Sequence, residues 1–141
     1  MEEVGRTLML IKPDGVKRGL IGKIIQRIEQ KGLKIIEIKV MSVDERTAGR
    51  LYAEHVHKQF FSSLVEYIMS GPVVAMVLEG KNVISVVRDM VGATDPSKAI
   101  KGTIRGDFAS SLTQNTVHAS DSLQSAKREI SIFFDESKFI E

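Results

Sequence analysis

The apolar run from Val73 to Leu78 is the feature that most limits how this chain can fold. It follows Gly71-Pro72, a pair that ends a preceding helix, and it contains no polar side chain. A continuous run of this kind is typical of a central strand that is covered on both faces. We therefore expect the rest of the chain to be arranged around this strand.

The segments on either side of the run alternate between strand-like and helix-like patterns. We expect strands at 7–11, 33–41, 73–78 and 116–118, and helices that begin near residues 21, 42, 61, 82 and 122. The order is strand, helix, strand, helical hairpin, strand, helix, strand, helix, which is that of an α+β, ferredoxin-like split βαβ domain. Right-handed crossovers place both main helices on one face of a four-stranded antiparallel sheet, with the helical hairpin as an insertion. Since the chain has 141 residues and no repeat or linker, we expect 1–141 to form a single domain.

Short-range signals predict how several of these elements begin and end. Lys12-Pro13-Asp14-Gly15 is a turn sequence, and Ser42 opens a capping box. Asn82 is suited to cap the fourth helix, and Ser120, Asp121 or Ser122 the last. In the strand 33–41, alternation puts Lys34, Ile36, Ile38 and Val40 on one face. Residues 92–115 lack sustained periodicity, so we expect a long loop, and loops of this length in compact domains usually bind a ligand or partner. At the end of the chain, we expect Phe133, Phe134, Phe139 and Ile140 to pack as an apolar tail.

Composition excludes several classes of function. The chain has no cysteine, which rules out disulfides, thiolate nucleophiles and cysteine-based zinc sites. A net charge of +2 is too small to indicate a nucleic-acid partner. No apolar run has the length of a membrane span and no signal-peptide pattern is present, so we expect a cytoplasmic protein that does not enter a membrane.

His118 lies where the last strand should end and the last helix should begin. The free N–H groups at the start of a helix favour a phosphate, and their positive potential would keep an imidazole neutral and nucleophilic. Asp121 opposes the second effect. Taken locally, a histidine that makes only a structural hydrogen bond is the alternative interpretation.

Five polar residues far apart in the sequence could converge on a polyanion: Lys12, Arg88, Thr94, Arg105 and Asn115. Each of them alone has a structural explanation, such as a solvated side chain or a charge at a helix end. The chain contains neither of the common glycine-rich nucleotide motifs, so a phosphate would have to be held by side chains. The pair His55 and His57 has no further histidine nearby, which favours a surface loop over a metal site.

Several segments together resemble the nucleoside diphosphate kinases. They are Ile11-Lys12-Pro13-Asp14-Gly15-Val16, Phe60-Phe61, 70–76, Gly92-Ala93-Thr94, Gly102-Thr103-Ile104-Arg105 and Asn115-x-x-His118-x-Ser120-Asp121-Ser122. The resemblance implies that His118 takes the γ-phosphoryl group of a nucleoside triphosphate such as ATP and passes it to a nucleoside diphosphate, by a ping-pong mechanism with broad base specificity. It also implies Mg²⁺ bound through the nucleotide phosphates, and a homo-oligomer, a hexamer or tetramer built from dimers.

The same resemblance assigns expected roles to individual residues. It implies that His55, Arg88, Thr94 and Arg105 bind the phosphates. It implies that Lys12 and Asn115 bind the ribose hydroxyls and lie near the transferred phosphate. The base would lie between Phe60 and Leu112, which suits broad specificity because stacking tolerates every base. Tyr52, Ser120 and Glu129 would hold His118, since a carboxylate on an imidazole fixes its orientation and tautomer.

The chain departs from the family pattern at a few positions. Thr113-Gln114 stand where Gly-Arg is usual, Lys101 where proline is frequent, and Ala119 where glycine is common. Ala119 must therefore have either an ordinary backbone conformation or some strain. Two other classes stay open at this point: an RNA-binding module, although no strand carries the expected aromatic motif, and a nucleotide-binding subunit without turnover.

Overall fold

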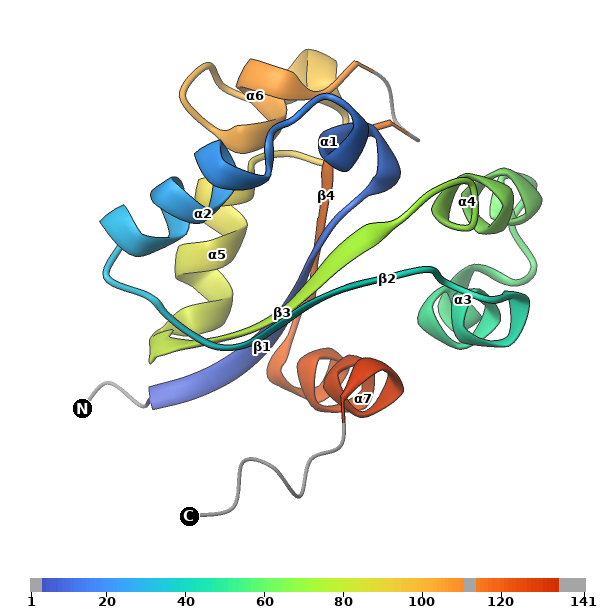
Figure 1. The fold of residues 1–141 in the computed structure, drawn as a ribbon, viewed down its shortest axis with the longest axis horizontal. Helices are drawn as coiled ribbons and strands as arrows, with labels where there is room; N and C mark the ends of the chain where they lie inside the picture. Colours follow the sequence, from blue (N-terminus) through green and yellow to red (C-terminus); the bar gives the residue numbers. More distant parts are fainter. Residues whose placement is uncertain (1–3, 111–113, 135–141) are drawn as a thin grey trace.

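The computed structural model describes residues 4–110 and 114–134, with a four-stranded antiparallel sheet at the centre (Figure 1). The strands are β1 Val4–Ile11, β2 Lys34–Met41, β3 Val73–Lys81 and β4 Val117–Ala119, in the order β2-β3-β1-β4. β3 pairs with β1 from Val4↔Lys81 to Ile11↔Val74 and with β2 on its other edge. The predicted α+β fold and the central place of the run at Val73 are confirmed.

Helices cover both faces of the sheet (Figure 1). The helices are α1 Pro13–Lys17, α2 Ile21–Gln30, α3 Glu45–Leu51, α4 Phe61–Ile68, α5 Val83–Val91, α6 Ile104–Phe108 and α7 Leu123–Phe133, with short 3-10 turns at Ala53–His55 and Pro96–Lys98. α2 and α5 lie on one face, as the crossover rule predicts, and the hairpin of α3 and α4 lies with α7 on the other.

Alternation along β1 divides the interior into two cores. Met9 and Ile11 pack toward α2 and α5, whereas Leu8 and Leu10 pack toward α3, α4 and α7, and all four side chains are fully buried. β3 alternates in the same way, which explains why no polar residue interrupts its apolar run. The strand β1 therefore runs between the two layers, and its C-terminal end leads directly to Lys12.

Several predicted boundaries were wrong in detail. Lys12-Pro13-Asp14-Gly15 begins the short helix α1, with proline at a position where the missing N–H costs nothing. α3 is capped by Asp44, which accepts a hydrogen bond from the Thr47 N–H at 2.7 Å, and not by Ser42. Asn82 precedes α5 with φ 51° but makes no side-chain cap. Of the three candidates for α7, Ser122 is the cap, accepting from the Ser125 N–H at 3.0 Å.

The segment 92–115 is not a continuous loop. It contains α6, and Thr103 caps the N-terminus of this helix: its hydroxyl oxygen accepts a hydrogen bond from the Gly106 N–H at 3.0 Å. A helix of five residues spans too few turns to show a periodic pattern in the sequence. Phe133 and Phe134 are buried as predicted, and Phe139 and Ile140 lie outside the described residues.

The predicted alternation along β2 was also wrong. The pairing with β3 shifts between Ile35 and Glu37, so one residue is left over as a β-bulge. Ile36 packs toward the α3, α4 and α7 core, whereas Ile38 and Val40 are 46% and 66% exposed. β2 is an edge strand of the described sheet, so its outer backbone groups pair with no other described strand, and they lie beside exposed apolar side chains. Among the helices described, none has the length and apolar character of a membrane span.

Candidate active site

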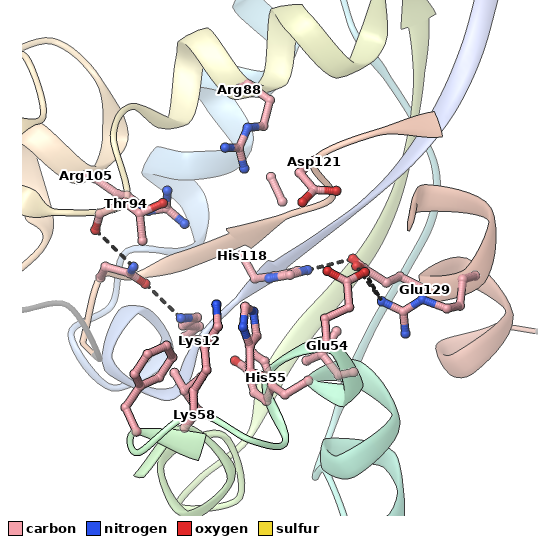
Figure 2. A pocket seen from close by; sticks show the side chains of 17 residues that line it. Lys12, Glu54, His55, Lys58, Arg88, Thr94, Arg105, His118, Asp121 and Glu129 are labelled. Atoms are coloured by element: carbon pink, nitrogen blue, oxygen red, sulfur yellow. Dashed lines mark hydrogen bonds and ion pairs between the residues drawn. The ribbon is translucent and has the colours of Figure 1, made fainter. Parts of the chain in front are cut away.

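A cavity of about 540 Å³ opens between the end of β1, β4 and the helical hairpin (Figure 2). All but two of the site residues predicted from the sequence line it. The exceptions are Ser120, which is buried just behind the wall, and Leu112, which lies outside the described residues. Residues from Lys12 to Glu129 thus meet at one place, as the convergence argument predicts.

His118 is the middle residue of β4, and its ring lies in the cavity (Figure 2). Its Nε2 is 2.7 Å from Glu129 Oε1, and the Ser120 hydroxyl donates to the same oxygen at 2.8 Å. Burial would raise the pKa of Glu129, but the hydrogen bonds from His118 and Ser120 and the nearby Arg128 guanidinium outweigh it and lower that pKa. An ionised carboxylate only accepts, so Nε2 carries the proton. Nδ1 keeps its lone pair, and no hydrogen bond to it occurs within the described residues.

The backbone before His118 forms a γ-turn. The Val117 N–H donates to Asn115 O at 2.8 Å, and Thr116 between them has φ 76°. Ala119, where the family commonly has glycine, is not among the described residues with positive φ. The strain in this segment therefore lies before the histidine and not after it.

Lys12, Asn115 and Thr94 line the cavity and form a hydrogen-bonded row. Figure 2 shows the two bonds as dashed lines between the labelled Lys12 and Thr94. Lys12 Nζ donates to Asn115 Oδ1 at 2.8 Å, and Asn115 Nδ2 donates to Thr94 O at 3.3 Å. Burial is the main cause that lowers the pKa of Lys12 to about 7, and the charge of Arg105 adds to it while Asp14 opposes it. The amine is therefore close to its titration point at neutral pH.

Arg105 and Arg88 bring two guanidinium groups to the same end of the cavity. Arg105 donates to Gly92 O at 3.1 Å and to Val117 O at 2.9 Å, and its Nε is buried without a partner among the described residues. Burial, followed by the charge of Arg88, lowers the pKa of Arg105 to about 10, so it stays charged at neutral pH. Arg88 extends from α5 toward the cavity (Figure 2). Arg105 thus anchors the turn before His118 as well as adding positive charge.

Aromatic rings form the opposite wall. The His55 ring centroid lies 5.9 Å from that of Phe60 and 6.3 Å from that of Tyr52, whose ring meets His118 edge-on at 6.4 Å. His55 Nδ1 is buried and has no partner among the described residues. Burial and the charge of Lys58 lower the pKa of His55. Phe60 lines the cavity and is 48% exposed.

Sequence reasoning missed several residues of the site. Arg128 Nη2 lies 3.4 Å from Glu129 Oε2 and 3.6 Å from Glu54 Oε1, and Lys58 lies 5.5 Å from the centroid of the Phe60 ring. Charged residues such as these are common on solvated helix faces, so nothing in their spacing distinguishes them. The complete cavity offers an imidazole with a free nitrogen, five basic side chains and a half-exposed aromatic ring, which suits a planar ring that carries several phosphates.

Comparison with known proteins also indicates a protein that acts on nucleotides. The family model described as "Nucleoside diphosphate kinase" matches residues 5–139. The chain is 58% identical over 135 residues to a nucleoside diphosphate kinase of Archaeoglobus fulgidus, covering 96% of this chain and 89% of that protein. It is 57% identical over 132 residues to one of Saccharolobus solfataricus, covering 94% and 96%. Among solved structures, a halophilic nucleoside diphosphate kinase from Halobacterium salinarum in complex with CDP aligns with a TM-score of 0.93 at 48% identity, covering 100% of this chain and 93% of that one.

Proposed function

Because the chain belongs to the nucleoside diphosphate kinase family and is a phosphotransferase that acts on nucleotides, we propose that it transfers the phosphoryl group through a phosphohistidine on His118. The observation that supports this most is the bond from His118 Nε2 to Glu129, because it leaves the lone pair of Nδ1 for the cavity. Nδ1 is accordingly the proposed nucleophile.

The reaction divides into two half-reactions. In the first, Nδ1 forms a bond to the γ-phosphorus of a nucleoside triphosphate while the bond from that phosphorus to the β-γ bridging oxygen breaks, and the nucleoside diphosphate leaves. In the second, the terminal oxygen of another diphosphate takes the phosphoryl group and the nitrogen is regenerated. Glu129 stabilises the positive charge that develops on the ring, and Lys12, Arg88 and Arg105 offset the negative charge of the phosphates.

The other residues that line the cavity receive roles by the same reasoning. His55 and Thr94 would help to bind the phosphates. Lys12 and Asn115 would bind the ribose hydroxyls. Phe60 would stack on the base, with Leu112 on the other side, which supports activity on every common base. Tyr52 would hold the His118 ring through its edge-on contact, and Ser120 would hold Glu129.

We propose Mg²⁺ as the divalent metal. The metal would arrive with the nucleotide, because Mg²⁺ is commonly bound through substrate phosphates in phosphoryl-transfer sites. Mg²⁺ would then be held by phosphate oxygens and water, and it would neutralise part of their charge.

The oligomer is proposed to be a hexamer or tetramer assembled from dimers. The β2 edge supports this, because Ile38 and Val40 leave an apolar strip beside unpaired backbone groups. We further propose that residues 1–141 act as one domain in the cytoplasm.

Labelling of the protein tests the proposal. Wild-type protein incubated with ATP labelled at the γ-phosphate should retain label after denaturation in base, which phosphohistidine survives, and should transfer it to CDP or GDP. His118→Ala should retain none while still binding nucleotide. A wild-type protein without base-stable label would contradict the proposal, and nucleotide binding without turnover would favour the non-catalytic alternative.

A further inference from the structure

The γ-turn before His118 is held in an unfavourable conformation. Thr116 has φ 76°, in the left-handed region that β-branched residues rarely adopt, and it is fully buried. Strained backbone of this kind persists only where the surrounding structure determines it. The contacts of Thr116 therefore show what holds the turn.

The short helix α1 is attached to the turn by two hydrogen bonds and by close packing. The Lys12 N–H donates to Thr116 O at 2.8 Å, and the Thr116 hydroxyl donates to Asp14 Oδ2 at 3.1 Å. A Cβ at Gly15 would lie 2.7 Å from Ile11 Cγ2, 3.1 Å from Thr116 Cγ2 and 3.2 Å from the Thr116 carbonyl oxygen, so a side chain at this position would force the helix away from β1 and the turn. α1 thus contacts both the backbone and the side chain of Thr116.

Asp14 is in turn fixed by α4. The Tyr67 hydroxyl donates to Asp14 Oδ1 and accepts from the Asp14 N–H at 2.6 Å. Burial, together with the hydrogen bond to Asp14, raises the pKa of Tyr67, so its hydroxyl keeps its proton as a donor. Hydrogen bonds therefore run from Tyr67 through Asp14 to Thr116, and none of these three side chains is among the described residues that line the cavity.

We propose that Tyr67, Asp14 and Thr116 form a positioning chain that holds the γ-turn and so sets His118 relative to Asn115 and Lys12. Asn115 and His118 lie on the two sides of Thr116, and both line the cavity. A change in the turn would therefore move the nucleophile relative to the row that holds the nucleotide. The three residues act through others and touch no substrate. This inference rests on the proposed phosphoryl transfer.

Thr116→Val tests the hydroxyl, because it keeps the β-branched shape and removes only the donor. We expect kcat to fall about tenfold with KM for the diphosphate changed less than about twofold, since an interaction that positions the nucleophile affects the transfer step. Thr116→Ser, which keeps the donor, should retain most of the activity. Equal losses in the two variants, or an unchanged kcat in Thr116→Val, would overturn the proposal.

Thr7→Val is the matched control. Thr7 on β1 is also fully buried, but its hydroxyl has no partner among the described residues. Its replacement removes the same atom without removing a hydrogen bond, so kcat should equal that of wild type. A loss as large as in Thr116→Val would show that the effect is one of general packing, and would count against the positioning chain.

The connection to Tyr67 is tested by combining variants. Tyr67→Phe should lower kcat as Thr116→Val does, and the double variant should lose little more than the larger single loss, because both act through Asp14. Losses that multiply in the double variant would show that the two residues act independently, and would overturn the chain.

A readout without turnover separates this inference from the proposed function. If wild-type protein forms no phosphohistidine, the proposed function fails. The positioning role can still be tested in that case, because the ¹⁵N resonances of the His118 imidazole report on the surroundings of the ring without turnover. We expect these to shift in Thr116→Val and not in Thr7→Val. Identical resonances in wild type and Thr116→Val would overturn the positioning role.

Discussion

Lys12 Nζ donates to Asn115 Oδ1 over 2.8 Å, and this bond joins residues that are 103 positions apart in the chain. It places an amine whose pKa burial lowers to about 7 directly beside the turn that carries His118. The protonation of Lys12 is therefore coupled to the fold and, under the proposed function, to the binding of phosphates.

Nucleotide binding at about pH 8.5 should take up a proton, because Lys12 is mostly neutral in the free protein at that pH and phosphates favour its charged form. Calorimetric titration in buffers of different ionisation enthalpy measures the uptake. Lys12→Gln should remove most of it. Uptake that is the same in the variant would assign the proton to another group.

The same pKa makes a prediction about stability. The folded pKa of about 7 lies below the ordinary lysine pKa of 10.5, so between these pH values the unfolded chain binds more protons than the folded protein. The cost of the buried charge is fully present below about pH 7 and is relieved as the pH rises toward 10.5. Urea unfolding should therefore show wild type gaining stability relative to Lys12→Gln across this window. Parallel pH profiles of the two proteins would contradict the assignment.

Glu129→Gln should lower the rate of His118 phosphorylation while leaving nucleotide affinity nearly unchanged. A hydrogen bond to a charged group contributes about 1.5–3 kcal/mol, which corresponds to roughly tenfold to a hundredfold in rate. Rapid-quench measurement of base-stable label gives this rate. Glu54→Gln is the matched control, since Glu54 contacts Arg128 but not His118, and a similar loss there would show that the charge of the cavity matters more than the bond.

Phe60→Ala should raise KM for all nucleoside diphosphates by a similar factor, because base stacking contributes about 1–3 kcal/mol whichever base is present. The side chain is half exposed, so the fold should be little affected. Tripolyphosphate, which has no base, serves as the control donor and should be used equally well by both proteins. A variant that loses one base selectively would indicate readout by hydrogen bonds instead.

Val40→Gln should weaken self-association through the β2 edge, because it replaces an exposed apolar side chain on an edge strand. Light scattering over a range of protein concentrations gives the mass of the assembly. Leu123→Gln on α7 makes the same change at a position of similar exposure and should leave the mass unchanged. Equal behaviour of the two variants would place the contact elsewhere.

The sheet and the larger helices were predicted well from the sequence because their apolar patterns repeat over many residues, and short elements were missed because they lack such a repeat. The apolar run at Val73 and the stripe along Ile21 to Ile28 repeat over enough residues to give a periodic signal. α1 and α6 have five residues each and show no such signal. The bulge between Ile35 and Glu37 was missed because alternation does not reveal which residue lacks a partner.

The candidate site shows the same division. His118 was singled out by its place between a strand and a helix, and Lys12 and Arg105 as cations that could converge on a polyanion. The resemblance to a family then gave them roles, and the structure brings all three into one cavity. The bonds of Asp14 to Tyr67 and Thr116 join residues 53 and 102 positions apart, and no local pattern marks them. The role of Arg105 as a donor to two carbonyl groups was likewise invisible, because it depends on where Gly92 and Val117 lie in space.

The site draws residues from both helical layers and from the strands between them, with Arg88 on α5 and Glu129 on α7. No part of the chain shorter than Lys12 to Glu129 contains it. Enzymatic activity should for this reason disappear in the same cooperative step as the tertiary structure, and a simple coupled assay becomes a reporter of native protein in a cell extract or on a denaturant gradient.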